Sequence, residues 1–112
     1  MKQETVTRKK RVDRNHIVYM LVVNGLRYVG STSKTESTVL KSVKARVSKH
    51  WYRAQTENKD WLICHALRQL TDRNEIEVKI LAVVRGKGPG HKREVELRRE
   101  LRPELNSDVR GD

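Results

Sequence analysis

The stretch His16–Thr32, HIVYMLVVNGLRYVGST, consists of two apolar runs on either side of Asn24-Gly25. Asn-Gly between two strand-like segments predicts a β-hairpin, because both residues tolerate the positive φ angles of a tight turn. We therefore expect strands over His16–Val23 and Leu26–Ser31. The first run is apolar on both faces, which predicts that it is a central strand of the sheet.

This hairpin is expected to carry two tyrosines on one face. With a two-residue turn, the facing pairs are Val23 with Leu26, Leu21 with Tyr28, and Tyr19 with Gly30. Tyr19 and Tyr28 are then diagonal neighbours whose backbones lie roughly 7–8 Å apart. Gly30 is expected to leave the space opposite Tyr19 empty. The two phenols are either the floor of a catalytic site or ordinary core residues.

The composition indicates one domain with a nucleic-acid partner. The 112 residues suffice for a modest core, which must come from Val, Ile and Leu because aromatic residues make up only 4%. A formal charge of +11 favours a polyanionic partner, with nucleic acid ahead of a membrane surface. We expect an intracellular protein, since no apolar run is long enough to span a membrane and no signal peptide is present. The single Cys64 excludes an internal disulfide.

Two segments are rich in basic residues. Residues 1–14 are expected to be a flexible basic arm ahead of a single domain at 15–112, and the alternative is a solvated tail. The candidate phosphate contacts of the arm are Arg8, Lys9, Lys10 and Arg11. Arg85–Gly90, RGKGPG, is expected to be a flexible loop whose Arg85 and Lys87 contact a nucleic-acid backbone. It lacks the GxxxxGK[ST] pattern of a phosphate-binding P-loop.

The first helix is expected to begin after Ser37 or Thr38, either of which can cap it, and to end near Ala54. Its buried stripe is Val39, Val43 and Val47. Arg46 and His50 are i, i+4 neighbours that continue this stripe. Polar residues at core-facing positions are expected where function overrides stability. The alternative is that the helix has turned towards solvent by Arg46.

The remaining elements complete a ββααβα order. A second helix is expected over Asp60–Leu70, capped by Asp60, with Cys64 and His65 away from its buried stripe and no role for His65. Alternation of apolar and charged residues predicts a third strand over Glu75–Val84. The last helix is expected to open near His91 and to end before Pro103, because the residue that precedes a proline disfavours the α conformation.

The last helix places a carboxylate on its buried side. Glu94 lies one turn before Leu97 and Leu101 on the same face. A buried carboxylate must be paired, protonated or bound to a cation, and the ordinary alternative is that Glu94 is the salt-bridge partner of Arg98. Beyond the helix, Asn106 has a side chain suited to bonding the backbone of a turn.

Taken together, these residues resemble the GIY-YIG endonuclease family over about residues 16–107. The residues that carry the resemblance are Ile17-Val18-Tyr19, Tyr28-Val29-Gly30, Arg46, His50, Glu94, Pro103 and Asn106. Their order and spacing are more specific than any single motif. Ile17 stands where the family has the first glycine of its name.

The resemblance implies a small α/β domain of the α+β type, with a three-stranded antiparallel sheet flanked by helices. It also implies metal-dependent hydrolysis of a DNA phosphodiester bond. Glu94 would hold a divalent cation, Mg²⁺ or Mn²⁺, that keeps most of its waters. The cation would neutralise charge on the phosphate and steady the leaving oxygen.

The resemblance further implies roles for the other residues of the set. Tyr19 would be the general base, and an unperturbed phenol is a poor base at pH 7. Nearby cations must therefore favour its ionised form, which Arg46 could do while it binds the phosphate. Tyr28 would bond the phosphate or its water, and His50 would assist either Tyr19 or the phosphate. Gly30 and Asn106 would support the site structurally.

Two other interpretations are consistent with the net charge of +11. One is a catalytically silent nucleic-acid-binding protein with the same fold, although without a metal Glu94 would repel the phosphate. The other is a basic RNA- or ribosome-associated domain, which leaves the residue set as coincidence. If the chain cuts both strands of DNA, a single site requires a homodimer, a protein partner or two successive events.

Overall fold

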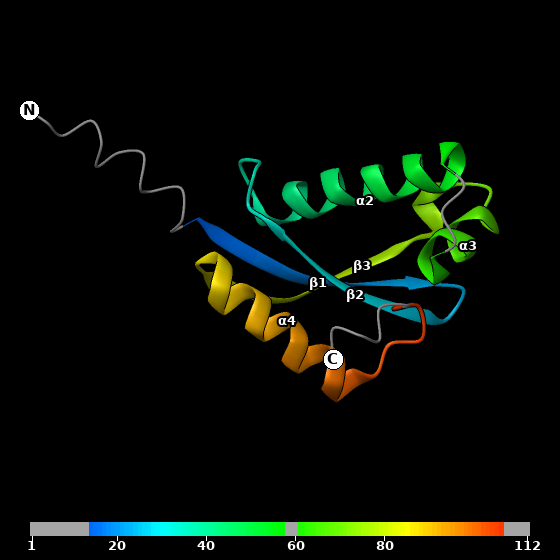
Figure 1. The fold of residues 1–112 in the computed structure, drawn as a ribbon. Coiled ribbons are helices and arrows are strands. Elements are labelled where there is room, and N and C mark those ends of the chain that lie inside the picture. Colours follow the sequence, from blue (N-terminus) through cyan, green and yellow to red (C-terminus); the bar gives the residue numbers. More distant parts are fainter. Residues whose placement is uncertain (1–13, 58–60, 107–112) are drawn as a thin grey trace, which may run out of the picture.

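The computed structural model describes residues 14–57 and 61–106, which form an α+β fold with the predicted ββααβα order (Figure 1). The helices and strands are β1 (Asn15–Val23), β2 (Leu26–Ser33), α2 (Val39–Thr56), α3 (Leu62–Arg68), the 3₁₀ helix η2 (Arg73–Glu75), β3 (Glu77–Arg85) and α4 (Lys87–Leu101). No helix in these two ranges is long and apolar enough to cross a membrane.

The described strands make an antiparallel sheet in the order β2-β1-β3, so the prediction that β1 is central is confirmed. The predicted turn is also confirmed, with positive φ at Asn24 (52°) and Gly25 (81°). The register pairs Val23 with Leu26, Leu21 with Tyr28, and Tyr19 with Gly30, as expected. Successive side chains along β1 therefore point to opposite faces of the sheet.

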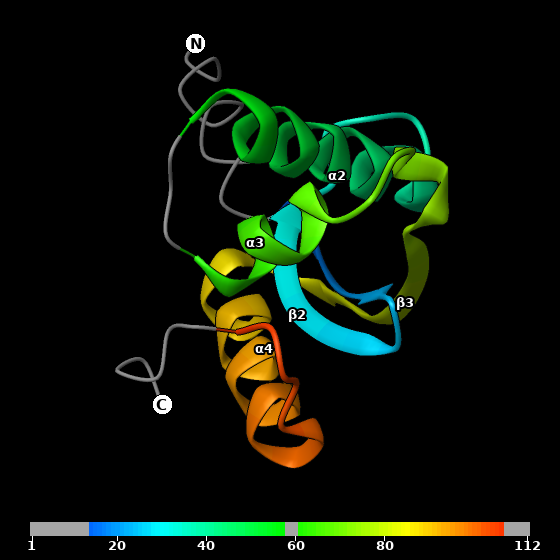
Figure 2. The same cartoon turned by 90° about the vertical axis from the view of Figure 1, so that its right-hand side faces the viewer.

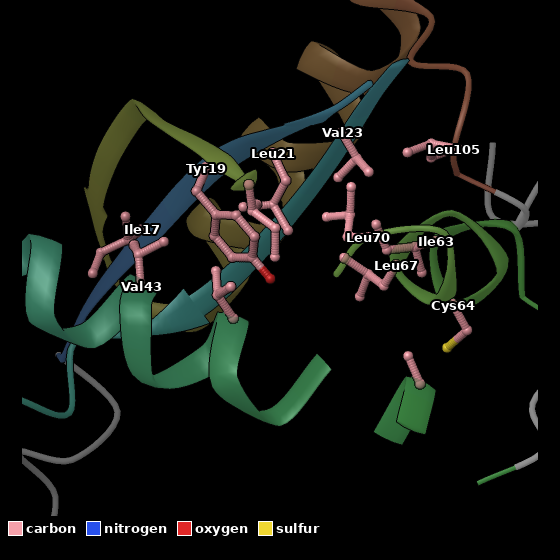
Figure 3. Close-up of a cluster of buried hydrophobic side chains, with 13 residues drawn as sticks. Ile17, Tyr19, Leu21, Val23, Val43, Ile63, Cys64, Leu67, Leu70 and Leu105 are labelled. Carbon is pink, nitrogen blue, oxygen red and sulfur yellow. The ribbon is translucent and has the colours of Figure 1, made fainter. Parts of the chain in front are cut away.

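Each face of the sheet is covered by helices, with α2 and α3 on one side and α4 on the other (Figures 1 and 2). The larger core lies under α2 and α3, where Ile17, Tyr19, Leu21 and Val23 of β1 point (Figure 3). The smaller core, under α4, is formed by Val18, Met20, Val29 and Leu97. Burial of β1 on both faces explains its uninterrupted apolar sequence.

Helix α2 agrees closely with the sequence prediction. Thr38 is the N-cap, and its Oγ1 accepts a hydrogen bond from Lys41 N at 3.1 Å. The helix ends at Thr56, two residues beyond the predicted Ala54. The alternative that the helix has turned towards solvent by Arg46 is wrong, because both His50 and Ala54 are buried.

Helix α3 is shorter than predicted. It begins at Leu62 after Trp61 and ends at Arg68, rather than spanning Asp60–Leu70, and the expected cap Asp60 lies outside the described residues. The prediction that Cys64 lies away from the buried stripe is wrong, because Cys64 is part of the larger core. Helix α3 packs against α2 and also contributes to the core that lies on the sheet. Contacts on two sides bury more of its surface than a single apolar stripe.

The segment around β3 and α4 differs most from the prediction. Strand β3 starts at Glu77 instead of Glu75, because Arg73–Glu75 forms a 3₁₀ turn capped by Asp72. The expectations of a flexible loop over Arg85–Gly90 and of a last helix that opens near His91 are both wrong, because α4 already starts at Lys87.

The glycines and the proline of this segment fit the start of a helix. Gly86 is the N-cap with φ 99°, and its carbonyl accepts from Gly90 N at 3.0 Å. Pro89 is tolerated there because the first-turn N–H groups have no partner within the helix. The helix ends at Leu101 with Arg102 in the left-handed region, before Pro103 as predicted.

Candidate active site

Tyr19 and Tyr28 lie on one face of the hairpin, and their rings fill the space above Gly30. Tyr19 is 1% exposed and Tyr28 is partly buried. A Cβ placed on Gly30 would lie 2.9 Å from Tyr19 Oη and 2.9 Å from Tyr28 Cε2. The expected empty space opposite Tyr19 is therefore wrong, because the side chains of the two tyrosines occupy it. A glycine here is what allows both rings to pack on the strand.

Substitution of Gly30 by alanine is expected to lower the free energy of unfolding by about 1–3 kcal/mol, as overpacking of a core typically does. The added methyl group would force Tyr19 and Tyr28 to shift from their present positions. Urea denaturation of the full chain measures this change. Gly88→Ala is the matched control, because a Cβ there meets no atom within 4 Å. Equal stability of the two variants would contradict the prediction.

Helix α2 brings His50 against the buried phenol. Its Nε2 lies 3.1 Å from Tyr19 Oη, and its ring meets Tyr28 edge-on with a centroid distance of 5.4 Å. The sequence left open whether His50 assists Tyr19 or the phosphate. In the free protein its hydrogen bond goes to Tyr19, so the two side chains form a Tyr–His pair between the sheet and α2.

The protonation states of this pair follow from burial. Burial, and then the charges of Arg46 and Arg53, lower the pKa of His50 to about 4, so the imidazole is neutral at pH 7. Burial also raises the pKa of Tyr19 above its ordinary value, and the neighbouring Tyr28 adds to this. Arg46 opposes the rise through its charge and a hydrogen bond, but the effect of burial is larger.

Arg46 thus favours the ionised form of Tyr19, as expected, but in the free protein burial outweighs it and the pKa of Tyr19 is raised. Burial, and then the charge of Glu94, likewise raise the pKa of Tyr28. Both phenols are protonated at pH 7. A neutral His50 next to a protonated Tyr19 leaves Nε2 able to accept the phenolic proton, if the ring carries its own proton on Nδ1.

The lowered pKa of His50 predicts that acid destabilises the fold. The unfolded chain binds a proton below about pH 6.5, whereas folded His50 binds it only near pH 4. Stability attributable to His50 is thus full above pH 6.5 and falls as the pH drops towards 4, by about 3 kcal/mol in all. Urea denaturation at pH 7.5 and 4.5 measures the loss. His50→Gln should reduce this pH dependence, and an unchanged slope in the variant would contradict the assignment.

Arg46, one turn before His50, reaches the mouth of the site. Its Nε is buried and has no hydrogen-bond partner among the described residues. The same side chain lines a surface cleft of about 310 Å³ and acts on the phenol of Tyr19. A guanidinium that offers N–H groups between a phenol and an open cleft is suited to bind a phosphate oxygen.

Glu94 of α4 lies beside the same cleft with 16% of its side chain exposed. Its Oε1 accepts a hydrogen bond from Ser31 Oγ at 2.8 Å and lies 3.8 Å from His91 Nδ1. Its Oε2 lies 4.0 Å from Arg98 Nε, so the salt bridge that the sequence offered as an alternative is a long one. The best-made hydrogen bond of Glu94 is therefore with Ser31 of β2.

The surroundings of Glu94 fit a hydrated divalent cation. No group of three or more His, Cys, Asp or Glu side chains in the described parts of the chain is arranged to enclose a metal. Mg²⁺ is commonly held by one or two carboxylates, with water and substrate phosphate completing its coordination. A single, partly exposed carboxylate beside an open cleft meets that requirement. It does not suit a metal that needs a full set of protein ligands.

Asn106 ties the C-terminal segment to the hairpin strand that carries Tyr28. Its Oδ1 accepts from Val29 N and its Nδ2 donates to Val29 O, both at 2.8 Å. Nearby, Leu105 N donates to Arg27 O, and Glu104 bonds the Arg27 side chain. Asn106 thus bonds backbone groups, but those of β2 rather than of its own turn.

The candidate nucleic-acid contacts are distributed unevenly. Arg8, Lys9, Lys10 and Arg11, and the basic arm to residue 13, lie outside the described residues. Lys87 and Arg46 line the cleft, whereas Arg85 is exposed at the end of β3 and does not line it. The sequence missed Ser31, His16 and His91, although His91 lies three residues before Glu94 and that spacing on a helix brings side chains together.

The site combines a Tyr–His pair, an arginine with an unsatisfied N–H, and a carboxylate beside a basic cleft. These groups suit transfer of a proton and stabilisation of charge on a phosphate. No protein-family model, curated protein or solved structure matches the chain. The chemistry of the site is therefore the basis for assigning a function.

Proposed function

We propose that this protein is a metal-dependent DNA endonuclease that hydrolyses phosphodiester bonds. The observation that carries the proposal is the arrangement of Arg46 and Glu94, which come from helices on opposite faces of the sheet. Arg46 lines a cleft with basic walls, and Glu94 accepts a hydrogen bond from Ser31 of the same cleft. Hydrolysis of a phosphodiester requires an activated water and stabilisation of negative charge. The site offers a group for each requirement.

The carboxylate of Glu94 would hold Mg²⁺ or Mn²⁺, with Ser31 fixing one of its oxygens. When bound, the cation supplies a Lewis acid that neutralises phosphate charge and stabilises the leaving oxygen. The phosphate itself is bound by the guanidinium of Arg46, whose buried Nε is ready to donate. Tyr28, whose pKa is raised by burial and by Glu94, remains a proton donor to a phosphate oxygen.

The Tyr–His pair provides a route for the proton of the attacking water. A free tyrosinate is disfavoured by burial, so Tyr19 cannot act as a pre-ionised base. Instead, Tyr19 accepts the proton of the water as its own proton passes to His50 Nε2, 3.1 Å away. The lowered pKa of His50 keeps the imidazole neutral and able to accept at pH 7.

A catalytically silent nucleic-acid-binding protein is the second candidate. The observation that favours it is the near-complete burial of Tyr19, which is 1% exposed and keeps its proton in the free protein. Glu94 distinguishes the two candidates, because a carboxylate beside the cleft weakens phosphate binding unless a cation neutralises it. A pure binder gains nothing from that carboxylate.

The deciding experiment is nicking of supercoiled plasmid by the purified full chain, with Mg²⁺ and with EDTA. We expect nicking with Mg²⁺ and none with EDTA, and stronger activity at low salt because phosphate contacts are salt-dependent. Parallel reactions contain branched DNA and RNA. Salt-sensitive binding with no cleavage of any substrate would reject the endonuclease and favour the silent binder. Preferential binding of RNA would favour an RNA-associated domain.

A further inference from the structure

The cleft beside Glu94 is lined by residues of four different elements. It measures about 310 Å³ and is enclosed by the start of β1, the end of β2, α2 and the first turns of α4. The residues that line it are His16, Ser31, Thr32, Ser33, Arg46, Lys87 and His91. Neither Tyr19 nor Tyr28 is among them, so the cleft lies beside the two phenols rather than over them.

The lining of this cleft is basic and rich in hydroxyl groups. It contains no carboxylate, and its four ionisable side chains are an arginine, a lysine and two histidines. The charges of Lys87 and Arg14 help to lower the pKa of His16, after burial, which indicates a positive potential there. Three consecutive hydroxyl residues of β2 complete the wall. Ser31 and Thr32 already donate their hydroxyl protons to Glu94 and to Ser33 O, so the binding of a phosphate group here depends mainly on the cationic side chains.

Close packing of α4 on β1 creates the basic end of the cleft. A Cβ on Gly90 would lie 2.6 Å from His16 Cβ, so only glycine lets the helix approach this closely. Lys87 and His91 are i, i+4 neighbours on α4, on the helix face that continues to Glu94. The glycine-containing start of α4 thereby places Lys87 and His91 next to His16.

Two residues belong both to the cleft and to the candidate active site. Ser31 lines the cleft and donates to Glu94 at 2.8 Å. Arg46 lines the cleft, and its guanidinium acts on the phenol of Tyr19. An anion in the cleft is therefore adjacent to the phosphate at the reacting position. A polynucleotide strand is a ligand that carries such adjacent anions, because its successive phosphates are linked through the sugars.

We propose that His16, Lys87 and His91 form a second phosphate subsite, which binds the backbone phosphate next to the scissile one on the same strand. This inference rests on the proposed function for the position of the scissile phosphate. The subsite fixes the direction in which the strand crosses the sheet, from the Tyr–His pair towards the start of α4. It explains why the basic residues of the cleft extend beyond the groups required for hydrolysis.

The four histidines of the chain allow the subsite to be tested separately from the function. The ring signals of the full-length protein are followed by NMR while a short DNA duplex is added in EDTA, so that no cleavage occurs. His16 and His91 report on the subsite, His50 on the reacting position, and exposed His65 of α3 is the internal control. We expect the first three to shift while His65 does not.

Three other patterns of histidine shifts would contradict one or both proposals. A shift of His50 alone would overturn the subsite and leave the endonuclease proposal intact. A shift of His16 and His91 without His50 would support a phosphate site in the cleft and contradict the proposed reacting position. No shift of any cleft histidine would overturn the subsite, and with no shift of His50 it would count against both proposals.

A binding measurement with two variants provides the second test. Lys87→Gln should reduce the slope of log affinity against log salt concentration by about 1, the loss of one phosphate contact. Lys92→Gln is the matched control, because Lys92 is an exposed lysine on the same helix that does not line the cleft. An equal effect of the two substitutions, or no effect of the first, would overturn the subsite.

Discussion

Glu94→Gln is expected to lower the rate of Mg²⁺-dependent nicking by about 10³-fold, because a metal ion contributes several kcal/mol of charge stabilisation. The amide oxygen of glutamine can still accept the hydrogen bond from Ser31 Oγ, so the side chain should keep its position. The negative charge that would hold the cation is lost. Single-turnover nicking of supercoiled plasmid measures the effect.

Glu100→Gln is the matched control for this prediction. Glu100 is an exposed carboxylate on the same helix, and its removal changes the net charge by the same amount. DNA binding by Glu94→Gln in EDTA should be equal to or tighter than that of the unmodified chain, since a carboxylate beside the cleft is removed. Nicking that survives in Glu94→Gln would show that Glu94 does not hold the catalytic metal.

Tyr19→Phe is expected to lower the nicking rate by about 10²–10⁴-fold, the usual contribution of general base catalysis. The substitution retains the buried ring and removes the hydroxyl group that hydrogen-bonds His50 and, in the proposed mechanism, would connect the attacking water to it. It leaves His50 Nε2 without that partner, so a modest loss of stability accompanies the loss of rate. Rates are measured at saturating Mg²⁺, with circular dichroism to verify the fold.

Tyr52→Phe serves as the control, since Tyr52 is 65% exposed on α2. It should retain full activity. If Tyr19→Phe also retained full activity while Glu94→Gln did not, the Tyr–His pair would be structural and the water would be activated by another group. Loss of rate in Tyr19→Phe without loss of DNA binding would place the hydroxyl in the chemical step.

The architecture was predictable to the extent that it depends on neighbours in the chain. The Asn24-Gly25 turn, the register of the hairpin and the Thr38 cap all follow from local backbone preferences and side-chain alternation. The start of α4 did not follow, because Gly-Lys-Gly-Pro-Gly has low helix propensity in isolation. Contact between Gly90 and His16 of β1, distant in sequence, is part of the packing that overrides that preference.

The candidate site was predictable as a set of residues but not as an arrangement. Helical spacing correctly brought His50 into the core side of α2 and placed Arg46, whose Nε is buried, on the same side. It could not show that His50 hydrogen-bonds Tyr19, that Ser31 bonds Glu94, or that the tyrosine rings fill the space above Gly30. These contacts join separate elements, and their distances depend on how the helices dock on the sheet.

The sequence by itself determined the order of the strands and helices, the central position of β1 and the basic charge of the chain. Only the tertiary structure decided the protonation of the site. The pKa values of Tyr19 and His50 move in the directions set by burial, in spite of the nearby charge of Arg46 in the case of the phenol. Burial is a property of the whole packed domain, because the elements that exclude water from a side chain come from every part of the sequence.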